Sequence, residues 1–566
     1  MKISGIICEY NPLHNGHLYH LEQVRRGGAE GIVAVMSGNF VQRGDAALLD
    51  KFTRARLAIE GGVDLVLELP VPYALAPAEN FAMGGVALLT ALGNVQEISF
   101  GSECGDIHLL SQAAQACQVC KTDYADVMDD FLRSGYSYPE VLSQMVGQLY
   151  GEETAAVLRS PNNTLAIAYL NAIEEMDSPL QPMTIPRKGA GHNSSQPAPD
   201  GTASATYIRQ FFAEGGDCRR MMPSYAWHAL REAKQNGHIA SMEYLERLIL
   251  YKLRTTDADD LHDIAEIGQG LEHRLYKAKR SASLEELLQA IRTKRYPMAR
   301  LRRILLHILL DIRTADIQNY PAYGRILAFN DTGREILRDS KNKRLLPFSH
   351  SLAELAHTSP EAGRCAALES QATDIYQLAR PVIGQGESDF RRKIVTSGGS
   401  HHAEEENRIA SASGTDRGGS LPALFPVRQQ QKRSHKRNYR RTAKHGNDRN
   451  DYYRGDRRAV SGHHSGTDRT HRSHRAGSAD GFAGGTGRTA GPAKSGTAYR
   501  LRSDLTDGST ELSGLPRGQA HHGRPVSHPC RTLSGNIRGS LYRLAPRCQR
   551  VGLLCTGNRG NRTEIP

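Results

Sequence analysis

Two histidines three residues apart, His14 and His17, stand in the segment CEYNPLHNGH, where a short apolar run gives way to a helical pattern. At the start of a helix the first backbone N–H groups are unpaired and the helix dipole favours anions. Gly16 lies between the two imidazoles, and a glycine there lets a phosphate or a nucleobase approach the backbone. Two imidazoles can also donate hydrogen bonds to phosphate oxygens as negative charge develops on a departing pyrophosphate. The spacing therefore predicts a phosphate-binding site; the alternative is that both histidines are polar residues of a helix cap.

A second segment, SATYIR, places hydroxyl side chains and an arginine at the start of another predicted helix. It runs from Ser204 to Arg209, and its hydroxyl groups and guanidinium could face phosphates. Ser204 is also an ordinary helix N-cap, so this segment alone indicates little.

These two segments must be positioned by the elements around them. Residues 1–190 alternate short apolar runs, which predict buried strands, with segments of helical period. The strands are expected at Ile3–Cys8, Gly31–Met36, Asp64–Leu69, Gln96–Phe100 and Leu180–Ile185, and the helices at His17–Arg26, Ala46–Glu60, Phe81–Leu92, Asp106–Cys120, Asp123–Ser134, Tyr138–Leu149, Thr164–Met176 and Ser204–Gly215. Continuous apolar strands separated by helices are typical of a parallel sheet that is covered on both faces. The predicted fold class is α/β, with a doubly wound parallel-sheet domain.

From Ser224 to about Arg380 strand signals are few and helical periods dominate, which predicts a second, α-helical domain. Within it, the segment TKRYPMARLRRILLHILL carries clustered cations, namely Lys294, Arg295, Arg300, Arg302 and Arg303. Such a cluster beside an apolar stripe predicts salt-dependent binding to a nucleic-acid backbone. The alternative is a solvated helix face.

The charge of the chain is divided unevenly. Residues 401–566 hold 30 Lys and Arg against 13 Asp and Glu, a net charge of +17, whereas residues 1–400 hold 42 against 47, a net charge of −5. The overall net charge of +12 therefore does not describe a basic folded enzyme. The last part also lacks a hydrophobic period, which predicts a disordered tail with too little apolar surface for a core.

Three interpretations of this tail stand beside each other: a basic arm for nucleic acid, a solvated tail without function, and an out-of-frame extension that is not native coding sequence. Arginine outnumbers lysine 26 to 4 there, which favours the third. Elsewhere no apolar run approaches the about 20 residues that a membrane-spanning helix needs, which argues against a membrane protein.

The HNGH segment matches the HxGH signature of the nucleotidyltransferase superfamily, and SATYIR resembles the late SxTxIR motif of that superfamily. Further segments are similar to the bacterial tRNA(Met) cytidine acetate ligase family, namely SGNFVQRGDAALLDKFTRARLAI, GVDLVLELP, ISFGSE, SPNNTLAIAYL, IPRKGAGHN and TKRYPMARLRRILLHILL. The resemblance runs from residue 1 to about residue 395 and stops where the composition changes. One departure concerns His192, because an aromatic residue is expected near that histidine and KGAGHN contains none.

The resemblance implies a cytoplasmic, ATP-dependent ligase that activates acetate as acetyl-adenylate and acetylates the wobble cytidine of elongator tRNA(Met). ATP is the implied substrate, and Mg²⁺ is expected to bridge its phosphates without a metal site made by the chain. Acetate and the tRNA are the implied partners, and neither a membrane nor a protein partner is implied. The implied domains are a nucleotidyltransferase domain over residues 1–222, an α-helical tRNA-binding domain over residues 223–397 and a low-complexity basic tail over residues 398–566.

The resemblance also implies roles for individual residues, with His14 and His17 as the catalytic pair. The implied ATP-binding residues are Ile7, Cys8, Glu9, Tyr10, Asn11, Pro12, Leu13, His14, Asn15, Gly16, His17, Leu18, Tyr19, His20, Gly101, Asn162, Arg187 and Lys188. The implied tRNA-binding residues are Lys294, Arg295, Arg300, Arg302 and Arg303. From the residues alone, Gly101 can simply end a strand, Asn162 can cap a helix and Arg187 can be a solvated cation.

Two other functions are compatible with the same motifs. One is a nucleotidyltransferase that adenylylates a small phosphorylated metabolite, and the other is a non-catalytic RNA-binding protein with an inactive nucleotide fold. The helical region with its clustered cations argues for a macromolecular substrate, and the intact HNGH segment argues against an inactive fold.

Overall fold

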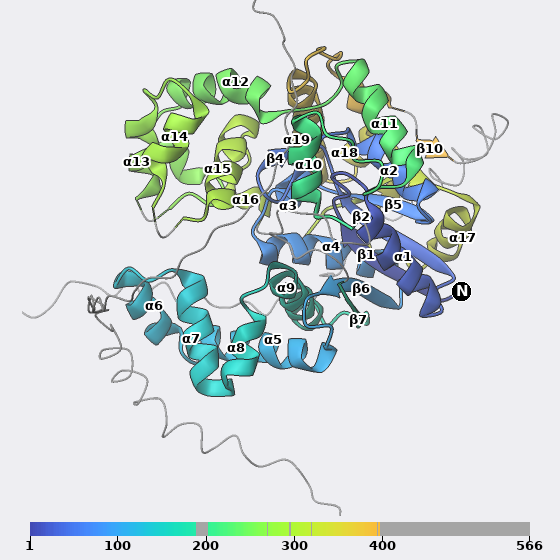
Figure 1. Ribbon diagram of the computed structural model, residues 1–566, viewed down its shortest axis with the longest axis horizontal. Coiled ribbons are helices and arrows are strands. Elements are labelled where there is room, and N and C mark those ends of the chain that lie inside the picture. The colour runs from blue at the N-terminus through green and yellow to red at the C-terminus, as the bar shows by residue number, and fades with distance from the viewer. Residues whose placement is uncertain (188–201, 269, 294–295, 318–319, 393, 397–566) are drawn as a thin grey trace, which may run out of the picture. The chain divides into compact units, whose positions relative to one another are not determined.

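The computed structural model describes residues 1–187, 202–268, 270–293, 296–317, 320–392 and 394–396 (Figure 1). Lys188, Lys294 and Arg295 lie outside the described residues, as do His192 and residues 398–566. What the sequence predicts for them stays a prediction.

An eight-stranded sheet forms the core of the described residues. Its strands are β1 (Ile3–Cys8), β2 (Gly31–Ser37), β5 (Leu65–Leu69), β6 (Glu97–Ser102), β7 (Gln181–Pro186), β8 (Gly324–Phe329), β9 (Phe348–Ser349) and β10 (Val395–Thr396). They lie in the order β10-β8-β5-β2-β1-β6-β7, and β9 pairs with β8. Each pair of neighbours from β5 to β7 is parallel, which confirms the predicted parallel sheet. The strand β8 meets β5 in the antiparallel direction.

Helices between the strands cover both faces of the sheet (Figure 1). On one face lie α1 (Asn15–Arg26), α2 (Lys51–Glu60), α10 (Ala205–Ala213) and α11 (Ser224–Gln235). On the other lie α4 (Ala78–Leu92), α5 (Ile107–Thr122), α9 (Pro161–Glu175) and α17 (Asp331–Ser340). The short α3 (Val71–Ala74) precedes α4, and α6 (Ala125–Arg133), α7 (Tyr138–Tyr150) and α8 (Glu152–Val157) lie between α5 and α9 in the chain.

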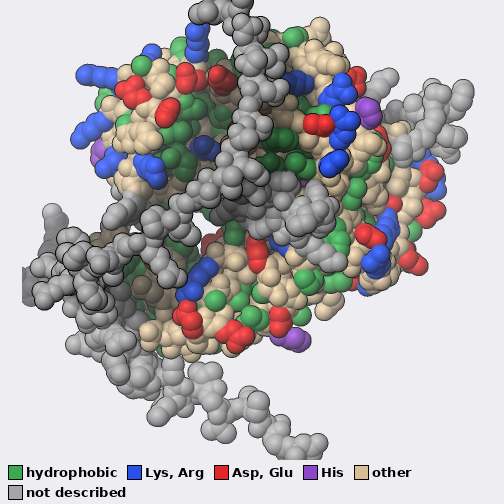
Figure 2. Space-filling view, viewed as in Figure 1, with side chains coloured by type: hydrophobic (Ala, Val, Ile, Leu, Met, Phe, Trp, Pro, Cys, Tyr) green, Lys and Arg blue, Asp and Glu red, His purple; other side chains and the backbone are tan. Residues whose placement is uncertain are grey.

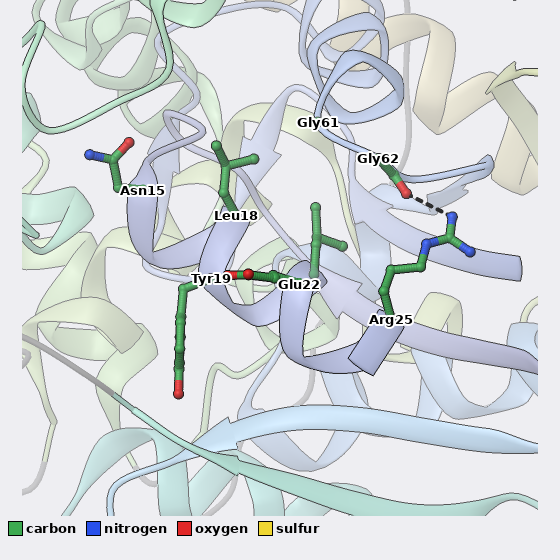
Figure 3. A pocket seen from close by; sticks show the side chains of 8 residues that line it. Asn15, Leu18, Tyr19, Glu22, Arg25, Gly61 and Gly62 are labelled. Carbon is green, nitrogen blue, oxygen red and sulfur yellow. Dashed lines mark hydrogen bonds between the residues drawn. The ribbon is translucent and has the colours of Figure 1, made fainter. Parts of the chain in front are cut away.

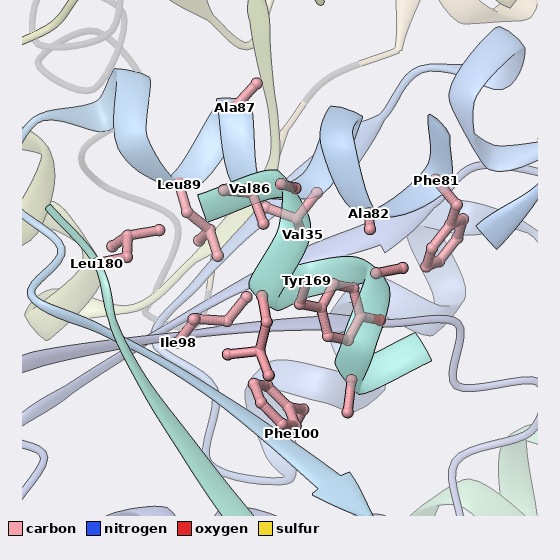
Figure 4. Packing of buried hydrophobic residues seen from close by; sticks show 14 of the residues in the cluster. Val35, Phe81, Ala82, Val86, Ala87, Leu89, Ile98, Phe100, Tyr169 and Leu180 are labelled. Atoms are coloured by element: carbon pink, nitrogen blue, oxygen red, sulfur yellow. The ribbon is translucent and has the colours of Figure 1, made fainter. Parts of the chain in front are cut away.

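The double covering explains why the strands are continuous apolar runs. Every residue of β2 and β5 is buried, because helices pack on both sides of these strands. In the core between the sheet and α4, Val35 and Ile98 pack with Leu89, and Phe100 lies against Tyr169 of α9 (Figure 4). The sheet is therefore a rigid platform for the loops that leave its ends.

A group of helices follows α11 in the chain. It comprises α12 (Met242–Thr255), the 3-10 turn η1 (Asp260–Asp263), α13 (Leu271–Ala278), α14 (Leu284–Ile291), α15 (Met298–Leu310) and α16 (Thr314–Ile317). Its apolar core contains Leu245 and Ile304, and it also includes Phe40 and Leu75 from the segments that follow β2 and β5. Among the described residues, no helix combines the length and the apolar character of a membrane span.

The last described segment differs from the helical prediction. After α16 the chain returns to the sheet as β8, β9 and β10, with α17, α18 (Leu352–Ala356), α19 (Pro360–Leu378) and α20 (Ser388–Arg391) among them. The run GRILAF of β8 is short and apolar, and a short apolar run has no period that separates a buried strand from a buried helix. Residues 324–396 thus combine strands with helices, and the division of the chain into domains stays a prediction.

Candidate nucleotide-binding site

The residues singled out in the sequence gather at one edge of the sheet. β1, β6 and β7 are parallel neighbours, so their carboxyl ends lie side by side. His14 follows β1, Gly101 lies near the end of β6, and Arg187 follows β7. The strand order turns between β1 and β6, and open parallel sheets bind ligands at such a switch point. We call residues 7–20, which connect β1 to α1, the histidine loop.

His14 and His17 stack on each other where α1 begins. Their ring centroids are 3.6 Å apart and the ring planes differ by 24°. Nδ1 of His14 accepts a hydrogen bond from the backbone N–H of Gly16 at 3.1 Å, and Nδ1 of His17 accepts one from the backbone N–H of His14 at 3.2 Å. A neutral imidazole that accepts at Nδ1 carries its proton on Nε2. The backbone thereby sets the tautomer of both rings, and each presents an Nε2–H donor.

Burial lowers the pKa of the histidines in this loop. The pKa of His14 falls to about 3 and that of His20 to about 4, because of burial first and then the positive charge of Arg187. The pKa of His17 also lies well below its ordinary value, because of burial first and then the neighbouring His14 and Arg187. All three imidazoles are therefore neutral at pH 7. The site offers them to an anion as hydrogen-bond donors rather than as cations.

The start of the histidine loop is held by Arg54 of α2, a side chain that is 1% exposed. Its guanidinium donates to the carbonyl of Glu9 at 2.5 Å, to the carbonyl of Leu49 at 3.0 Å and to the carbonyl of Gly38. Sequence reasoning missed this residue. In the segment KFTRARLAIE nothing distinguishes Arg54 from Arg56, which forms an exposed ion pair one half-turn away. Only its tertiary contacts identify Arg54 as the residue that ties three loop carbonyls together.

The SATYIR segment lies against the histidine loop. Nη1 of Arg209 donates to the carbonyl of Asn11 at 2.8 Å, and Nη2 donates to Oγ1 of Thr206 at 3.3 Å. Oγ of Ser204 accepts from the backbone N–H of Tyr207 at 3.2 Å, so this hydroxyl is the N-cap of α10. The two motifs are thus in contact through an arginine, while Ser204 serves its own helix.

The other expected nucleotide ligands occupy different parts of this edge. A Cβ atom built on Gly101 would lie 3.4 Å from Cγ of Arg187, so the glycine leaves space along which the arginine side chain lies. Asn162 donates from its amide to Oε1 of Glu103 at 2.6 Å, which joins the end of β6 to the start of α9. Its oxygen is left for another donor, and its contact with a nucleotide stays a prediction.

The cations predicted to bind RNA differ in their surroundings on α15. Arg302 is exposed. Arg303 is 8% exposed, and its guanidinium donates to both carboxylate oxygens of Glu266 at 2.5 and 2.6 Å and to the carbonyl of Gln42 at 3.2 Å. Arg300 donates to the backbone carbonyl of Glu266 at 2.8 Å. Contact of Arg303 with RNA would require its bonds to break, whereas Arg300 is half-buried and Arg302 is exposed.

Figure 2 shows Lys and Arg side chains along the outer edge of the helices α12–α15, with Asp and Glu side chains among them. The visible face of this group is therefore of mixed charge rather than uniformly basic. Affinity for an RNA backbone then depends on individual arginines more than on a uniform positive field.

An open cavity of about 500 Å³ lies between α1 and the Gly61-Gly62 turn that follows α2 (Figure 3). Its lining comprises Asn15, Leu18, Tyr19, Leu21, Glu22, Arg25, Gly61 and Gly62. Arg25 is already bound to the carbonyl of Gly62 at 3.1 Å and to the carboxylate of Asp64. The lining does not include His14 or His17, so this cavity is separate from the stacked imidazoles.

The described residues contain no group of three His, Cys, Asp or Glu side chains placed to hold a metal ion. Glu9, the carboxylate of the histidine loop, accepts a hydrogen bond from the backbone N–H of Gln42 at 2.8 Å, and burial raises its pKa. These residues do not form a magnesium cage of their own.

Comparisons with known proteins agree with this geometry. The sequence profile of the HIGH Nucleotidyl Transferase family matches residues 1–389. The tRNA(Met) cytidine acetate ligase of Caldanaerobacter subterraneus subsp. tengcongensis is 37% identical over 403 residues, which cover 70% of this chain and all of that protein. The enzyme of the same name from Alkaliphilus metalliredigens is 36% identical, over 69% of this chain and 97% of that one. 

Two crystal structures of Thermotoga maritima TmcAL, one apo and one bound with alpha-thio ATP, match with a TM-score of 0.66 and 31% identity. Each match covers 70% of this chain and 99% of the other. The resemblance seen in the motifs is thereby confirmed along the whole length of these relatives. The chain therefore belongs to the HIGH nucleotidyl transferase family and, within it, to the family of the tRNA(Met) cytidine acetate ligases.

Proposed function

We propose that this protein activates acetate with ATP as acetyl-adenylate and then acetylates the wobble cytidine of elongator tRNA(Met). One observation carries the proposal: two stacked, neutral imidazoles stand at the start of α1, with their tautomers set so that both Nε2–H groups can donate. The names of the relatives supply the acetate and the tRNA, and the relative with bound alpha-thio ATP supplies the nucleotide.

In the first step a carboxylate oxygen of acetate forms a bond to the α-phosphorus of ATP. The bond from that phosphorus to the bridging oxygen of pyrophosphate breaks, and pyrophosphate leaves with the electron pair. Negative charge grows on the leaving group, and preorganised donors stabilise it most where water is excluded. His14, His17 and the backbone N–H groups at the start of α1 are donors of this kind. No nucleophile from the protein is needed, because positioning and charge stabilisation do most of the work.

Neutral imidazoles suit this step because they need not be discharged before a ligand arrives. A charged pair of histidines 3.6 Å apart would repel each other, and burial would add to the cost. The hydrogen bonds from the backbone to both Nδ1 atoms hold the rings in place before ATP binds. The donors therefore require little reorganisation as the transition state forms.

In the second step the exocyclic amine of the cytidine attacks the carbonyl carbon of the acetyl group. The bond from that carbon to the phosphate oxygen breaks, AMP leaves, and the amine loses one proton to a base or to solvent. The cytidine must reach the same edge of the sheet as ATP. Arg302 of α15 is exposed, which supports α15 as a surface for the RNA backbone.

The proposal is tested by incubating the protein with ATP, isotopically labelled acetate and elongator tRNA(Met), followed by mass spectrometry of the tRNA nucleosides. We expect one labelled acetyl group per tRNA, on the wobble cytidine. An elongator tRNA(Met) with uridine at the wobble position is the matched control, because it keeps the fold of the RNA and lacks the amine. Labelled acetate at another nucleoside, or none in the presence of ATP, contradicts the proposal.

The same assay separates the competing functions. A nucleotidyltransferase for a small phosphorylated metabolite would release pyrophosphate with that metabolite and not with acetate. A non-catalytic RNA-binding protein would bind tRNA and consume no ATP under any of these conditions. Acetate-dependent pyrophosphate release before tRNA is added is the outcome that only acetyl-adenylate formation explains.

A further inference from the structure

A small hairpin stands between the histidine loop and the helix α15. It consists of β3 (Phe40–Val41) and β4 (Asp45–Ala46), which pair in the antiparallel direction. The backbone N–H of Gln42 donates to Oε1 of Glu9 at 2.8 Å, and the carbonyl of Gln42 accepts from Arg303 at 3.2 Å. One residue of the hairpin is therefore bonded to the histidine loop on one side and to α15 on the other.

The tip of this hairpin is in direct contact with α15 at Gly44. This glycine has φ +73°, a left-handed conformation that L side chains rarely adopt. A Cβ atom built on it would lie 2.5 Å from the backbone nitrogen of Arg303 and 2.7 Å from Cβ of Arg302. Its N–H also donates to the carbonyl of Val41 at 2.9 Å, which closes the turn. The tip is thus held tightly against the helix, and only glycine fits there.

Arg43 lies between these two anchored residues, and its side chain is exposed. Its positive charge opposes the rise that burial causes in the pKa of Glu9, and it adds to the lowering that burial causes in the pKa of Arg209. The cations that act on the imidazole of His14 are instead Arg187 and Arg209. Arg43 is therefore placed one step away from the imidazoles, on the side that leads to α15.

Arg302 on α15 is a second exposed cation near Arg43. It follows Leu301 on the helix and adjoins Gly44, the neighbour of Arg43. Two carboxylates offset part of the charge: Glu9, which takes the N–H of Gln42, and Asp45, whose pKa is raised by burial and held down by Arg209 and Arg302. Arg43 and Arg302 are the exposed cations beside these two carboxylates.

We propose that Arg43 and Arg302 form a clamp for the phosphate backbone of the RNA next to the nucleotide that is modified. The proposal rests on the proposed function. It identifies a surface on which the RNA would extend from α15 to the nucleotide site. One guanidinium group stands on the hairpin and the other on α15. Because each can bind a phosphate with two hydrogen bonds from a fixed backbone position, the pair suits two successive phosphates better than flexible cations would. The hairpin thereby joins the proposed nucleotide site to the proposed RNA-binding surface of α15.

The test compares Arg43→Ala, Arg302→Ala and the double variant with a control, Arg338→Ala. Arg338 is an exposed arginine of α17, which packs beside β2, β5 and β8, so its removal changes the net charge equally. Three quantities are measured: tRNA affinity from 50 to 200 mM KCl, acetate-dependent pyrophosphate release without RNA, and acetylation of tRNA. Arg43→Lys and Arg302→Lys keep the charge and report whether the bidentate guanidinium matters.

Each single Ala variant is expected to make the slope of log K against log salt shallower by about 1, and the double variant by about 2, because each arginine neutralises one phosphate. The control is expected to keep the slope of the unaltered protein. The loss of tRNA affinity should exceed any loss of RNA-independent pyrophosphate release at least about tenfold, since the clamp stands apart from the imidazoles.

Two results overturn the clamp. If the slopes of both variants match the control, the arginines are solvated cations without an RNA contact. If pyrophosphate release without RNA falls as far as RNA affinity does, Arg43 acts on the phosphates of ATP instead. Failure of the proposed function has a different signature, because the unaltered protein would then release no pyrophosphate with acetate at all.

Discussion

A buried cluster of five ionisable groups and the stacked histidines place polar side chains in the interior in opposite ways. The cluster comprises Lys51, Glu68, Arg325, Glu369 and Asp389, each at most 1% exposed. Lys51 lies 2.6 Å from Glu68 and 2.7 Å from Asp389. Arg325 lies 3.0 Å from Glu68 and 2.8 Å from Asp389. In this cluster every charge is directed at another side chain of the protein.

The stacked histidines, in contrast, are neutral, and each carries an Nε2–H group that we propose donates to a bound nucleotide. Burial lowers the pKa of His14 to about 3, and the Nδ1 atoms of both stacked rings are used by the backbone. Charges that satisfy one another contribute to fold specificity, whereas neutral donors held in place without a partner contribute to ligand binding. The comparison distinguishes a structural set of polar residues from a functional one.

The helix α2 serves both regions. Lys51 begins this helix and belongs to the cluster, while Arg54, three residues later, binds the carbonyl of Glu9 in the histidine loop and the carbonyl of Gly38 after β2. Lys51 is also bound at its backbone N–H by Asn39, whose amide donates to Thr373 near the cluster. The segment after β8 is thus attached to the same helix that supports the nucleotide site.

The largest effect is expected from breaking the cluster. Lys51→Met removes one of two cations and leaves Glu68, Glu369 and Asp389 with Arg325 alone. Removing one partner of a buried ion pair costs about 3–5 kcal/mol, so the free energy of unfolding should fall by that amount. Urea denaturation measures it. Lys343→Met is the control, because Lys343 pairs with Asp339 on the surface and should cost less than about 1 kcal/mol.

The next largest effect is expected at the functional pair. His17→Ala removes one donor to the leaving pyrophosphate and should slow acetate-dependent pyrophosphate release by about 10²–10³, or about 3–4 kcal/mol in the barrier. Its unfolding free energy should change far less than that of Lys51→Met. His108→Ala, an exposed histidine of α5, is the matched control. If His17→Ala releases pyrophosphate at nearly the rate of the control, His17 does not donate to the leaving pyrophosphate.

The two regions are also expected to respond to pH with opposite sign. The pKa of Glu369 is raised to about 8 from 4.5, by burial first and then by the neighbouring Glu68. The native state then keeps a proton that the unfolded chain releases, so stability falls as pH rises from about 4.5 to about 8. With that proton, two cations face two carboxylates. The pKa values of His14 and His20 are lowered in the native state. Below pH 6.5 the unfolded chain binds protons that the native state does not, so stability falls as pH falls.

Of these groups, only Glu369 differs in protonation between the native and the unfolded state from pH 6.5 to pH 8. Glu369→Gln should therefore flatten the decline in stability over this range, which is at most about 1.4 kcal/mol per pH unit for one proton. Urea denaturation at several pH values measures the slope. Glu335→Gln on the exposed side of α17 is the control. An unchanged decline in Glu369→Gln means that Glu369 is not the group that holds the proton.

The smallest effect is expected from removing residues 398–566. Both regions lie within the residues that match the family, and the relatives end within about 400 residues. A chain that stops at Ser397 should keep its thermal midpoint and its acetylation activity. Because 30 cations are lost, affinity for RNA should fall equally for elongator tRNA(Met) and for an unrelated RNA. Loss of discrimination between the two RNAs, or unfolding, contradicts this prediction.

Local sequence patterns predicted most strands of the parallel sheet, because a strand or helix pattern depends on residues that are neighbours in the chain. The strands β1, β2, β5, β6 and β7 were all expected within two residues of their observed bounds. The helix expected from Ala46 begins instead at Lys51, because Asp50 caps it by accepting from the N–H groups of Phe52 and Thr53. Ala46 belongs to β4, a strand of two residues with no period of its own.

The sequence by itself determined the strand-loop-helix that carries HNGH, because apolar runs, an N-cap and a glycine act over a few residues. It did not determine which cations are buried. Arg54, Arg303 and Lys51 all lie in helical segments that resemble solvated faces, and their partners Glu9, Glu266 and Asp389 are tens to hundreds of residues away. A cation is stable in the interior only when such partners surround it. The tertiary structure alone brings them together, and it thereby decided which cations are buried and which are exposed.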